Sequence, residues 1–236
     1  MIPTWLNSLA DRNVAFGSDT FTNNTTGSFN VVAGFNTLRC SVTGSSNVAI
    51  GHRALNLGTY VENSVAIGVD TAKNSCATNI VAIGAAALFC NVSGNYSTAL
   101  GNHALYCSTA DKNIGIGTCA GCNLTSGTNN TVIGNDALAS SATVSNEITL
   151  GNSSVTSLRT AADIVPFTDA TQNLGSTSLR WDNIYTTDLH LSNENKKSGN
   201  EIDGTTGDWT IQEGSEDLYI VNNKSGKRYK FKLEEV

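Results

Sequence analysis

Charged and aromatic residues are both scarce in this sequence of 236 residues. Asp, Glu, Lys and Arg make up 14% of it, and Phe, Trp and Tyr make up 7%, whereas typical domains are roughly 25% charged. Small and polar residues take their place, which argues against an ordinary enzyme core. The formal net charge of −6 also argues against a nucleic-acid partner, because binding to phosphates requires a basic patch.

Long apolar runs are absent as well. No stretch approaches the roughly 20 apolar residues of a membrane span, and the first residues lack the basic and apolar regions of a secretory signal. We therefore expect no membrane insertion and synthesis in a cytoplasm. The sequence contains six cysteines, and without a secretory signal we expect them to be reduced.

A short repeated phrase is abundant between about residues 13 and 160. It reads Asn-Val-Ala-Ile-Gly at 47–51, Ser-Val-Ala-Ile-Gly at 64–68 and Asn-Thr-Val-Ile-Gly at 130–134. The glycines that close the phrase are spaced 16 or 17 residues apart, and this fixed period predicts a solenoid of about nine stacked coils. These glycines are Gly17, Gly34, Gly51, Gly68, Gly84, Gly101, Gly117, Gly134 and Gly151.

Each repeat alternates large and small side chains. Larger apolar residues stand three and one positions before the glycine with a small residue between them, as in Val65, Ala66 and Ile67. This alternation predicts a short strand, which we expect to be buried on both faces. The glycine suits a corner, because it tolerates positive φ and close backbone approach. A second apolar pair, such as Ala104-Leu105, follows, and a polar loop returns the chain.

One coil cannot bury its own apolar side chains, so neighbouring coils must stack. Each repeat carries two apolar stripes, and we expect one to fill the coil while the other meets partner chains around a cyclic axis. The predicted fold class is all-β: a trimeric parallel β-roll or β-helix of about nine 16–17-residue coils, followed by a small antiparallel β domain.

The phrase resembles that of a known group of proteins. Its Ala-Ile-Gly core is similar to the head repeats of trimeric autotransporter adhesins, which form a left-handed parallel β-roll. With the later Ala-Leu pair it looks still more like repeats in bacteriophage fibre proteins. The resemblance covers roughly residues 13–155 and implies a homotrimeric fibre.

The composition changes near Thr160. Residues 13–160 contain 5 Lys+Arg and 6 Asp+Glu, while the shorter stretch 161–236 contains 8 and 13. A domain boundary is expected there, where Pro166 stops a central strand from continuing. The predicted divisions are a docking or capping segment at 1–12, the repeat region at 13–160, a β connector at 161–190 and an antiparallel β domain at 191–236.

The connector carries a second resemblance. Residues 169–185 are similar to a Leu-Gly-Ser…Arg-Trp…Ile-Tyr motif found near the C-terminal ends of phage tail fibres and tail spikes. In those proteins the motif generally belongs to a β-structured trimeric connector. The matching residues here are Leu174, Gly175, Arg180, Trp181, Ile184 and Tyr185.

Alternating runs near the C-terminus predict a small antiparallel sheet. Strands are expected at 209–211, 218–220 and 229–233, with a hairpin loop at 222–226. We expect the basic side chains of the last strand to lie on one face and to pair with the acidic run 213–217. Candidate receptor contacts are Tyr219, Tyr229 and Lys230; alternatively, these residues close the end of the assembly.

Other chemistry-bearing patterns are weak. Cys119 and Cys122 have the spacing of a zinc or redox pair but no second pair nearby, so packing within the coil is expected. Asp19, Asp70 and Asp136 occupy equivalent positions on different coils, as paired carboxylates for sugar cleavage would, but no aromatic platform lies beside them. We expect no catalytic residue, no metal ligand and no cofactor.

Together these patterns predict a structural virion protein, a phage tail or head fibre made in the host cytoplasm, which catalyses no reaction. A homotrimer would contact other virion proteins at its N-terminus and a host cell-surface glycan or protein at its C-terminal domain, gaining avidity from three copies. The alternatives are a fragment of a cellular trimeric adhesin and a fibre-borne polysaccharide depolymerase. Residues expected to dock on the virion are Trp5, Leu6 and Leu9.

Overall fold

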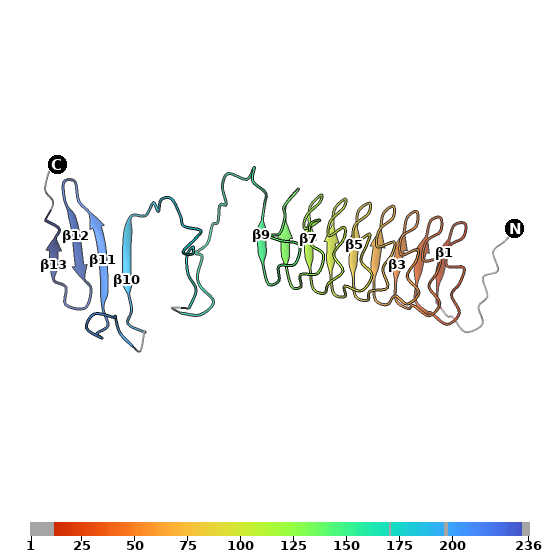
Figure 1. Cartoon of the computed structure of the whole chain (residues 1–236), viewed down its shortest axis with the longest axis horizontal. Coiled ribbons are helices and arrows are strands. Elements are labelled where there is room, and N and C mark those ends of the chain that lie inside the picture. The colour runs from red at the N-terminus through yellow and green to blue at the C-terminus, as the bar shows by residue number, and fades with distance from the viewer. Residues whose placement is uncertain (1–11, 170, 196–197, 233–236) are drawn as a thin grey trace. The chain divides into compact units, whose positions relative to one another are not determined.

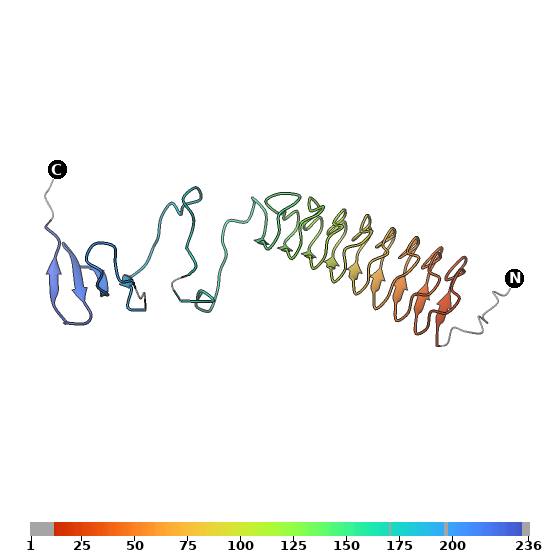
Figure 2. The ribbon, with the colours of Figure 1, turned by 60° about the horizontal axis from the view of Figure 1, so that its bottom comes forward.

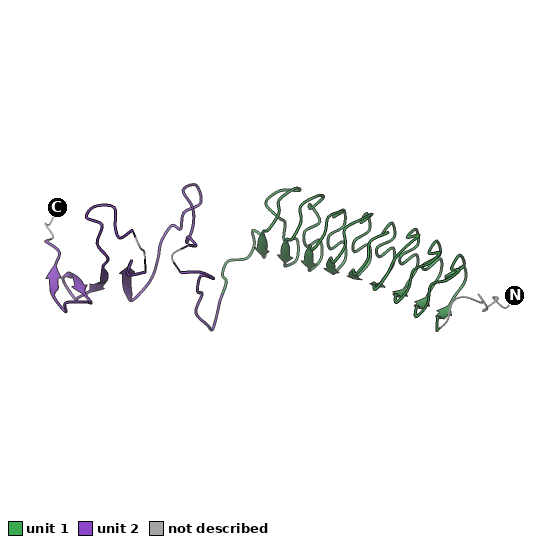
Figure 3. Cartoon of the chain, turned by 90° about the horizontal axis from the view of Figure 1, so that it is seen from below, with its two compact units in different colours: residues 1–158 green, residues 159–236 purple. Residues whose placement is uncertain are grey.

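The computed structural model describes residues 12–169, 171–195 and 198–232. In this part of the chain all regular structure is β, as the sequence predicts. The chain divides into two compact units, residues 1–158 and 159–236 (Figure 3). The sequence prediction set the division two residues later, after 160.

The first unit is a parallel β-solenoid, which we call the shaft. Its nine three-residue strands pair in sequence order with no crossover, and they stand side by side in one sheet (Figure 1). Equivalent residues of successive repeats are partners, as in Val48 with Val65. The strands are β1 (Val14–Phe16), β2 (Val31–Ala33), β3 (Val48–Ile50), β4 (Val65–Ile67), β5 (Val81–Ile83), β6 (Thr98–Leu100), β7 (Ile114–Ile116), β8 (Thr131–Ile133) and β9 (Ile148–Leu150).

The small middle residue of each strand points into the coil. In β3 to β6 this residue is alanine, and each of these alanines is fully buried. Opposite them lies the second apolar pair of the repeat, represented by Ala54 with Leu55 and Ala104 with Leu105, also fully buried. The prediction that one apolar stripe fills the coil is therefore confirmed. In β2 and β8 the same position holds Val32 and Val132, also fully buried, so the coil interior accepts residues up to the size of valine.

The corner glycines pack against one another from coil to coil. For Gly17 through Gly117, a Cβ atom would lie 1.7–2.8 Å from the carbonyl group of the next corner glycine, and φ is between +127° and +141°. Both the close approach and the backbone conformation exclude other residues. The coils stack one after another along the shaft (Figure 2).

Asparagine stands four residues before the corner glycine in five of the nine coils, and we call these residues the asparagine column. They are Asn13, Asn30, Asn47, Asn113 and Asn130; Ser64, Ile80, Ser97 and Glu147 take this position in the other coils. Asn47 Nδ2 donates to Asn30 Oδ1 (3.0 Å) and to the Val61 carbonyl (2.7 Å), while Asn47 Oδ1 accepts from the Ser64 N–H (3.0 Å). Asn113 and Asn130 repeat the pattern. Each side chain thus satisfies backbone groups that would otherwise be buried without partners.

The second unit contains a four-stranded antiparallel sheet, which we call the terminal sheet. Its strands are β10 (Asp188–Ser192), β11 (Asp208–Glu213), β12 (Leu218–Asn222) and β13 (Arg228–Lys230), paired in that order. The predicted strands and hairpin loop are present, but the last strand, expected at 229–233, ends at Lys230, with Phe231 and Lys232 outside it and Leu233 outside the described residues. Strand β10 was not predicted, because a single apolar–polar alternation of Leu189, His190 and Leu191 is a weak signal.

The predicted β connector is not β-structured in this single chain. Residues 161–169 and 171–187 contain no strand, and their side chains are exposed almost throughout. The correction has a physical reason: these residues have no neighbouring strand in the chain with which to exchange backbone hydrogen bonds.

Candidate functional site

The outward face of the shaft sheet is apolar and incompletely covered. It consists of the side chains three and one residues before each corner glycine, and we call it the outer sheet face. The exposed fraction is 39% for Ile50, 40% for Ile83 and 37% for Ile116, rising to 78% for Phe16 in β1 and 73% for Ile148 in β9. The expectation that both faces of the strands are buried is therefore wrong for one chain alone. A continuous apolar column of this kind marks an interaction surface.

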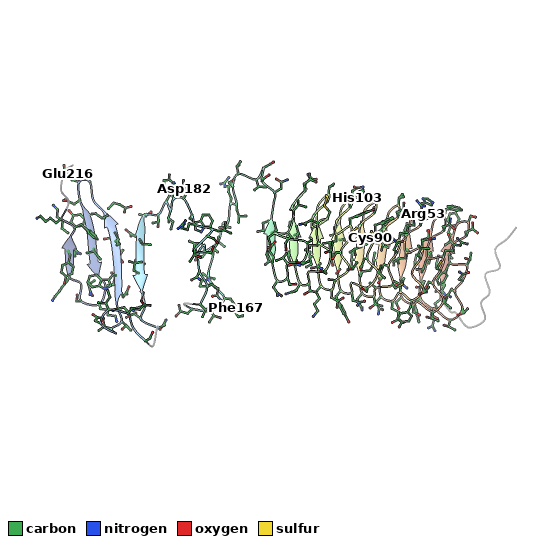
Figure 4. The ribbon with its side chains drawn as sticks, in the orientation of Figure 1. Arg53, Cys90, His103, Phe167, Asp182 and Glu216 are labelled. Atoms are coloured by element: carbon green, nitrogen blue, oxygen red, sulfur yellow. A yellow bond between two sulfur atoms is a disulfide. The ribbon has the colours of Figure 1, made fainter. Side chains whose placement is uncertain are left out.

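The residues of the Leu-Gly-Ser…Arg-Trp…Ile-Tyr motif, which we call the fibre motif after the resemblance noted above, are exposed too. The exposed fraction is 74% for Leu174, 62% for Trp181, 66% for Ile184 and 94% for Tyr185. Gly175 has φ of +82°, and the N–H of Ser176 donates to the Leu179 carbonyl (2.8 Å), so the motif begins with a local turn. Phe167 and Asp182 lie in the same strand-free stretch (Figure 4). These large apolar side chains have little to pack against within the chain.

The terminal sheet separates the three candidate receptor residues. Tyr219 pairs with Lys230 across β12 and β13, whereas Tyr229 pairs with Ile220 and so lies on the opposite face. The Lys230 Nζ contacts Asp217 at 2.7 Å, and the Tyr219 hydroxyl donates to the same carboxylate (3.3 Å). Tyr219 and Lys230 therefore form one polar cluster with Asp217 that does not include Tyr229.

The ion pair in this cluster shifts both pKa values. The hydrogen bond from Lys230 lowers the pKa of the Asp217 carboxyl, and the same bond raises the pKa of Lys230. Both groups remain charged around neutral pH. The predicted pairing of the acidic run with the basic face is confirmed for Asp217.

The face that carries Tyr229 is apolar. Leu189, Leu191, Trp209, Ile211 and Ile220 occupy this face by their register positions. The rings of Trp209 and Tyr229 are 6.0 Å apart at 42°. Leu189 and Leu191 remain 44% and 48% exposed, so this second apolar surface is also only partly covered within the chain.

Charged and aromatic side chains form a column along the shaft corners. Two guanidinium nitrogens of Arg53, Nε and Nη2, contact the two carboxylate oxygens of Asp70 at 2.8 Å each. The Phe89 ring stacks on the Tyr106 ring with 5.2 Å between centroids. Arg53 and His103 both lie at these corners (Figure 4). Asp70 is thus engaged in an ion pair, and Asp19 and Asp136 lie on other, non-adjacent coils, so the structure does not bring the three aspartates together.

The cysteines differ in part from expectation. The sulfur atoms of Cys119 and Cys122 are joined in a disulfide, whereas reduced thiols packed in the coil were expected. The other four cysteines are free thiols. Cys90 and Cys107 occupy the same position in successive coils, and burial raises the pKa of the Cys90 thiol to about 11. That thiol is therefore protonated and a poor nucleophile at neutral pH.

The expected virion-docking residues, Trp5, Leu6 and Leu9, lie outside the described residues. Within the described ranges, His, Cys, Asp and Glu nowhere gather in a group of three or more that could hold a metal ion. Within the same ranges, no helix has the length and apolar character needed to cross a membrane.

Two kinds of binding surface therefore emerge from the geometry: the outer sheet face of the shaft, and the two faces of the terminal sheet. The first is a long apolar column suited to another copy with the same repeat, and the second combines aromatic and charged groups suited to a soluble or cell-surface ligand. Comparison with known proteins found no match to the chain among protein-family models, curated proteins or solved structures.

Proposed function

We propose that this protein is a structural fibre of a virion, a phage tail or head fibre, and that three copies associate through their outer sheet faces. The single observation that carries the proposal is the row of outward-facing, mostly apolar side chains on nine in-register strands, in which Ile50, Ile83, Ile116 and Ile133 are 37–40% exposed. Burying apolar surface contributes about 25 cal/mol per Å², so a contact repeated on every coil favours parallel copies aligned over the whole shaft.

The resemblance of the repeats and of residues 169–185 to fibre proteins supports a trimer rather than a dimer. The exposed side chains of the fibre motif and of the Tyr229 face fit the same arrangement, because a second and a third copy would cover them. In this role the protein presents three terminal sheets to a host cell surface. Three linked weak contacts give high avidity without any strong single contact.

Immunoelectron microscopy of intact particles tests this assignment. Antibodies against residues 198–232 should label projections on virions purified from infected cells, at a constant position on the capsid or tail. Particles without label, together with label on the envelope of uninfected cells, would show instead that the chain belongs to a cellular adhesin.

A second assay separates the fibre from a depolymerase. The purified protein is incubated with host envelope polysaccharides, and newly formed reducing ends are measured. We expect no increase over buffer. Release of reducing ends that disappears in an Asp70→Asn variant would assign catalysis to the shaft instead.

A further inference from the structure

A cavity of about 530 Å³ opens at one end of the terminal sheet. Asn193 and five residues between Asn200 and Gly207, which lie between β10 and β11, form one wall, and Lys224 of the loop between β12 and β13 lies at another. Its lining includes Leu191, Asn193, Asp203, Thr206, Trp209 and Lys224. The volume falls within the range typical of small-molecule sites. None of the three receptor candidates chosen from the sequence lines it.

The cavity has an apolar aromatic side. Leu191 and Trp209 are paired residues of β10 and β11 and therefore share one face of the sheet. The indole of Trp209 lies against Gly207, where a Cβ atom would come within 2.8 Å of its Nε1, and its other neighbour is the Tyr229 ring. These contacts hold the indole in place, so it offers a preformed flat surface.

The opposite wall supplies fixed hydrogen-bonding groups. Asp203 Oδ1 accepts from the Thr205 N–H (3.0 Å), the Thr205 hydroxyl (2.8 Å) and Asn200 Nδ2 (2.6 Å). The bond from the Thr205 N–H is the main cause that lowers the pKa of this carboxyl. All three bonds use Oδ1, so Oδ2 can accept from a ligand while the carboxylate stays in place.

Lys224 ties the two walls together. Its Nζ contacts Glu194 at 3.0 Å and donates to the Thr206 hydroxyl at 3.2 Å. The ammonium is balanced by Glu194, and the ionised Asp203 gives this wall a negative group. An acidic ligand is therefore disfavoured, and a neutral ligand with several hydroxyls fits the lining.

We propose that this cavity binds a neutral pyranose sugar. The C–H groups of one ring face would pack on Trp209, and two ring hydroxyls would donate to Asp203 Oδ2 and to the carbonyl oxygen of the Asn193 side chain. The inference rests on the proposed function, because it names the class of receptor that a fibre would recognise. Recognition of this kind suits a multivalent protein, since each open site binds weakly and the copies act together.

Saturation-transfer NMR on the full chain tests the site. The probes are the methyl glycosides of galactose, glucose and N-acetylglucosamine, with methyl glucuronide as the acidic comparison. We expect at least one neutral glycoside to receive saturation at millimolar concentration, and the glucuronide to bind at least tenfold more weakly. The absence of transfer to all three neutral glycosides would overturn the proposal, as would equal or better binding of the glucuronide.

Three variants connect binding to the cavity. Trp209→Leu should weaken binding of the neutral glycoside at least tenfold. Asp203→Asn keeps an Oδ1 acceptor for the loop, so the sheet should stay folded, yet it should abolish discrimination against the glucuronide. Gln212→Ala, whose side chain lies on the other face of the sheet, is the control and should change neither result. If Asp203→Asn binds both sugars as the unaltered protein does, the site is wrong.

Failure of the sugar site and failure of the proposed fibre role give different experimental results. A protein that labels virions but binds no neutral glycoside would keep its role as a fibre and lose this site. A protein that binds sugar through Trp209 but never labels virions would keep the site and lose the role as a fibre.

Discussion

In this shaft, asparagine side chains make hydrogen bonds to backbone groups that, in ordinary sheets, backbone groups of neighbouring strands make. Asn30 and Asn47 are fully buried, and their side chains form hydrogen bonds with neighbouring coils: Asn30 Oδ1 accepts from the Asn47 N–H, and Asn47 Nδ2 donates to the Val61 carbonyl. An unpaired buried donor or acceptor is destabilising by about 1–3 kcal/mol. The asparagine column therefore fixes the vertical alignment of the coils, while the apolar residues supply the general stability.

Substitution of Asn47 tests the role of this column. Asn47→Leu keeps the approximate size of the side chain but leaves the Val61 carbonyl and the Ser64 N–H without partners. We therefore expect the free energy of unfolding to fall by about 2–4 kcal/mol. Asn47→Ser, which places at this position the residue found at 64 in the next coil, should be less destabilising. Urea denaturation followed by far-UV circular dichroism measures both. Equal stability of the leucine variant and the unaltered protein would refute the role of the hydrogen bonds.

The close packing of the corner glycines predicts that replacing one of them lowers stability. In Gly84→Ala the new Cβ would lie 2.5 Å from the carbonyl of Gly101 at a φ of +129°, so the neighbouring coil must move. We expect a loss of about 3 kcal/mol or more. Ala86→Gly in the same turn, where φ is +55°, should be neutral or stabilising, because it relieves left-handed strain. The same urea measurement applies, and similar losses in both variants would rule out stacking as the reason for the glycine.

Each coil is an element built from a three-residue strand and turns, and its ends need separate support. In the last coil, Glu147 stands at the position that Asn130 occupies in the coil before it. Its Oε1 accepts from the Ser140 N–H (2.8 Å) and the Thr149 hydroxyl (2.9 Å). The hydrogen bonds from Ser140 are the largest cause that lowers the pKa of this carboxyl below its ordinary value of 4.5. The ionised glutamate thus closes the end of the column.

This arrangement predicts a pH dependence for the last coil. Because the pKa is lower in the folded state, the contribution of Glu147 is complete above pH 4.5 and is lost as the pH falls through the folded pKa. Glu147→Gln should lower the melting temperature at pH 7, and the difference from the unaltered protein should shrink in acid. Glu62→Gln is the control, since the Glu62 carboxylate contacts the Tyr60 hydroxyl instead. A difference that is constant between pH 7 and pH 3 would contradict the assignment.

Sequence patterns predict the elements of the shaft better than its surfaces. The Val-Ala-Ile-Gly phrase locates every strand and corner because alternation and glycine act locally. The orientation of the phrase is not local: Ala66 faces inward and Ile67 outward, and the inward position also accepts valine, as at Val32 and Val132. The asparagines at 30 and 47 carry a readable period, yet a polar residue beside a strand is also typical of a turn.

The candidate sites depend on contacts between segments far apart in the sequence, which a pattern does not specify. Tyr219 and Tyr229 are candidates of the same kind from the sequence, and the strand register places them on opposite faces. Trp209 lines the cavity together with Asn200, Asp203 and Thr205, and no local pattern predicts that these residues meet. The disulfide of Cys119 and Cys122 lies in a corner turn with the same positive φ values as other coils, at Cys119 and Gly121 as at Arg53 and Leu55, so the turn itself did not signal it.

At the scale of the whole molecule, a single chain leaves large apolar surfaces uncovered in both of its units. The outer sheet face, the fibre motif and the Tyr229 face have this property in common. Monomeric soluble proteins rarely expose apolar surface so extensively. We propose that copies of the chain associate through these surfaces, which would cover all three.

One lysine in the middle of the outer sheet face tests which surface mediates association. In Ile83→Lys an ammonium would enter the contact between copies, and the outward position leaves the coil interior intact. We expect association to weaken at least a hundredfold while the circular dichroism spectrum of the shaft is kept. Val92→Lys, a substitution of an exposed valine in a loop away from this face, is the matched control and should leave association unchanged.

Sedimentation equilibrium of the purified chain at micromolar concentration measures whether three copies associate. We expect a single species of three times the 24.7 kDa chain mass, which Ile83→Lys converts to monomer. A folded monomer of the unaltered protein at that concentration, with its outer sheet face free in solution, would contradict this expectation.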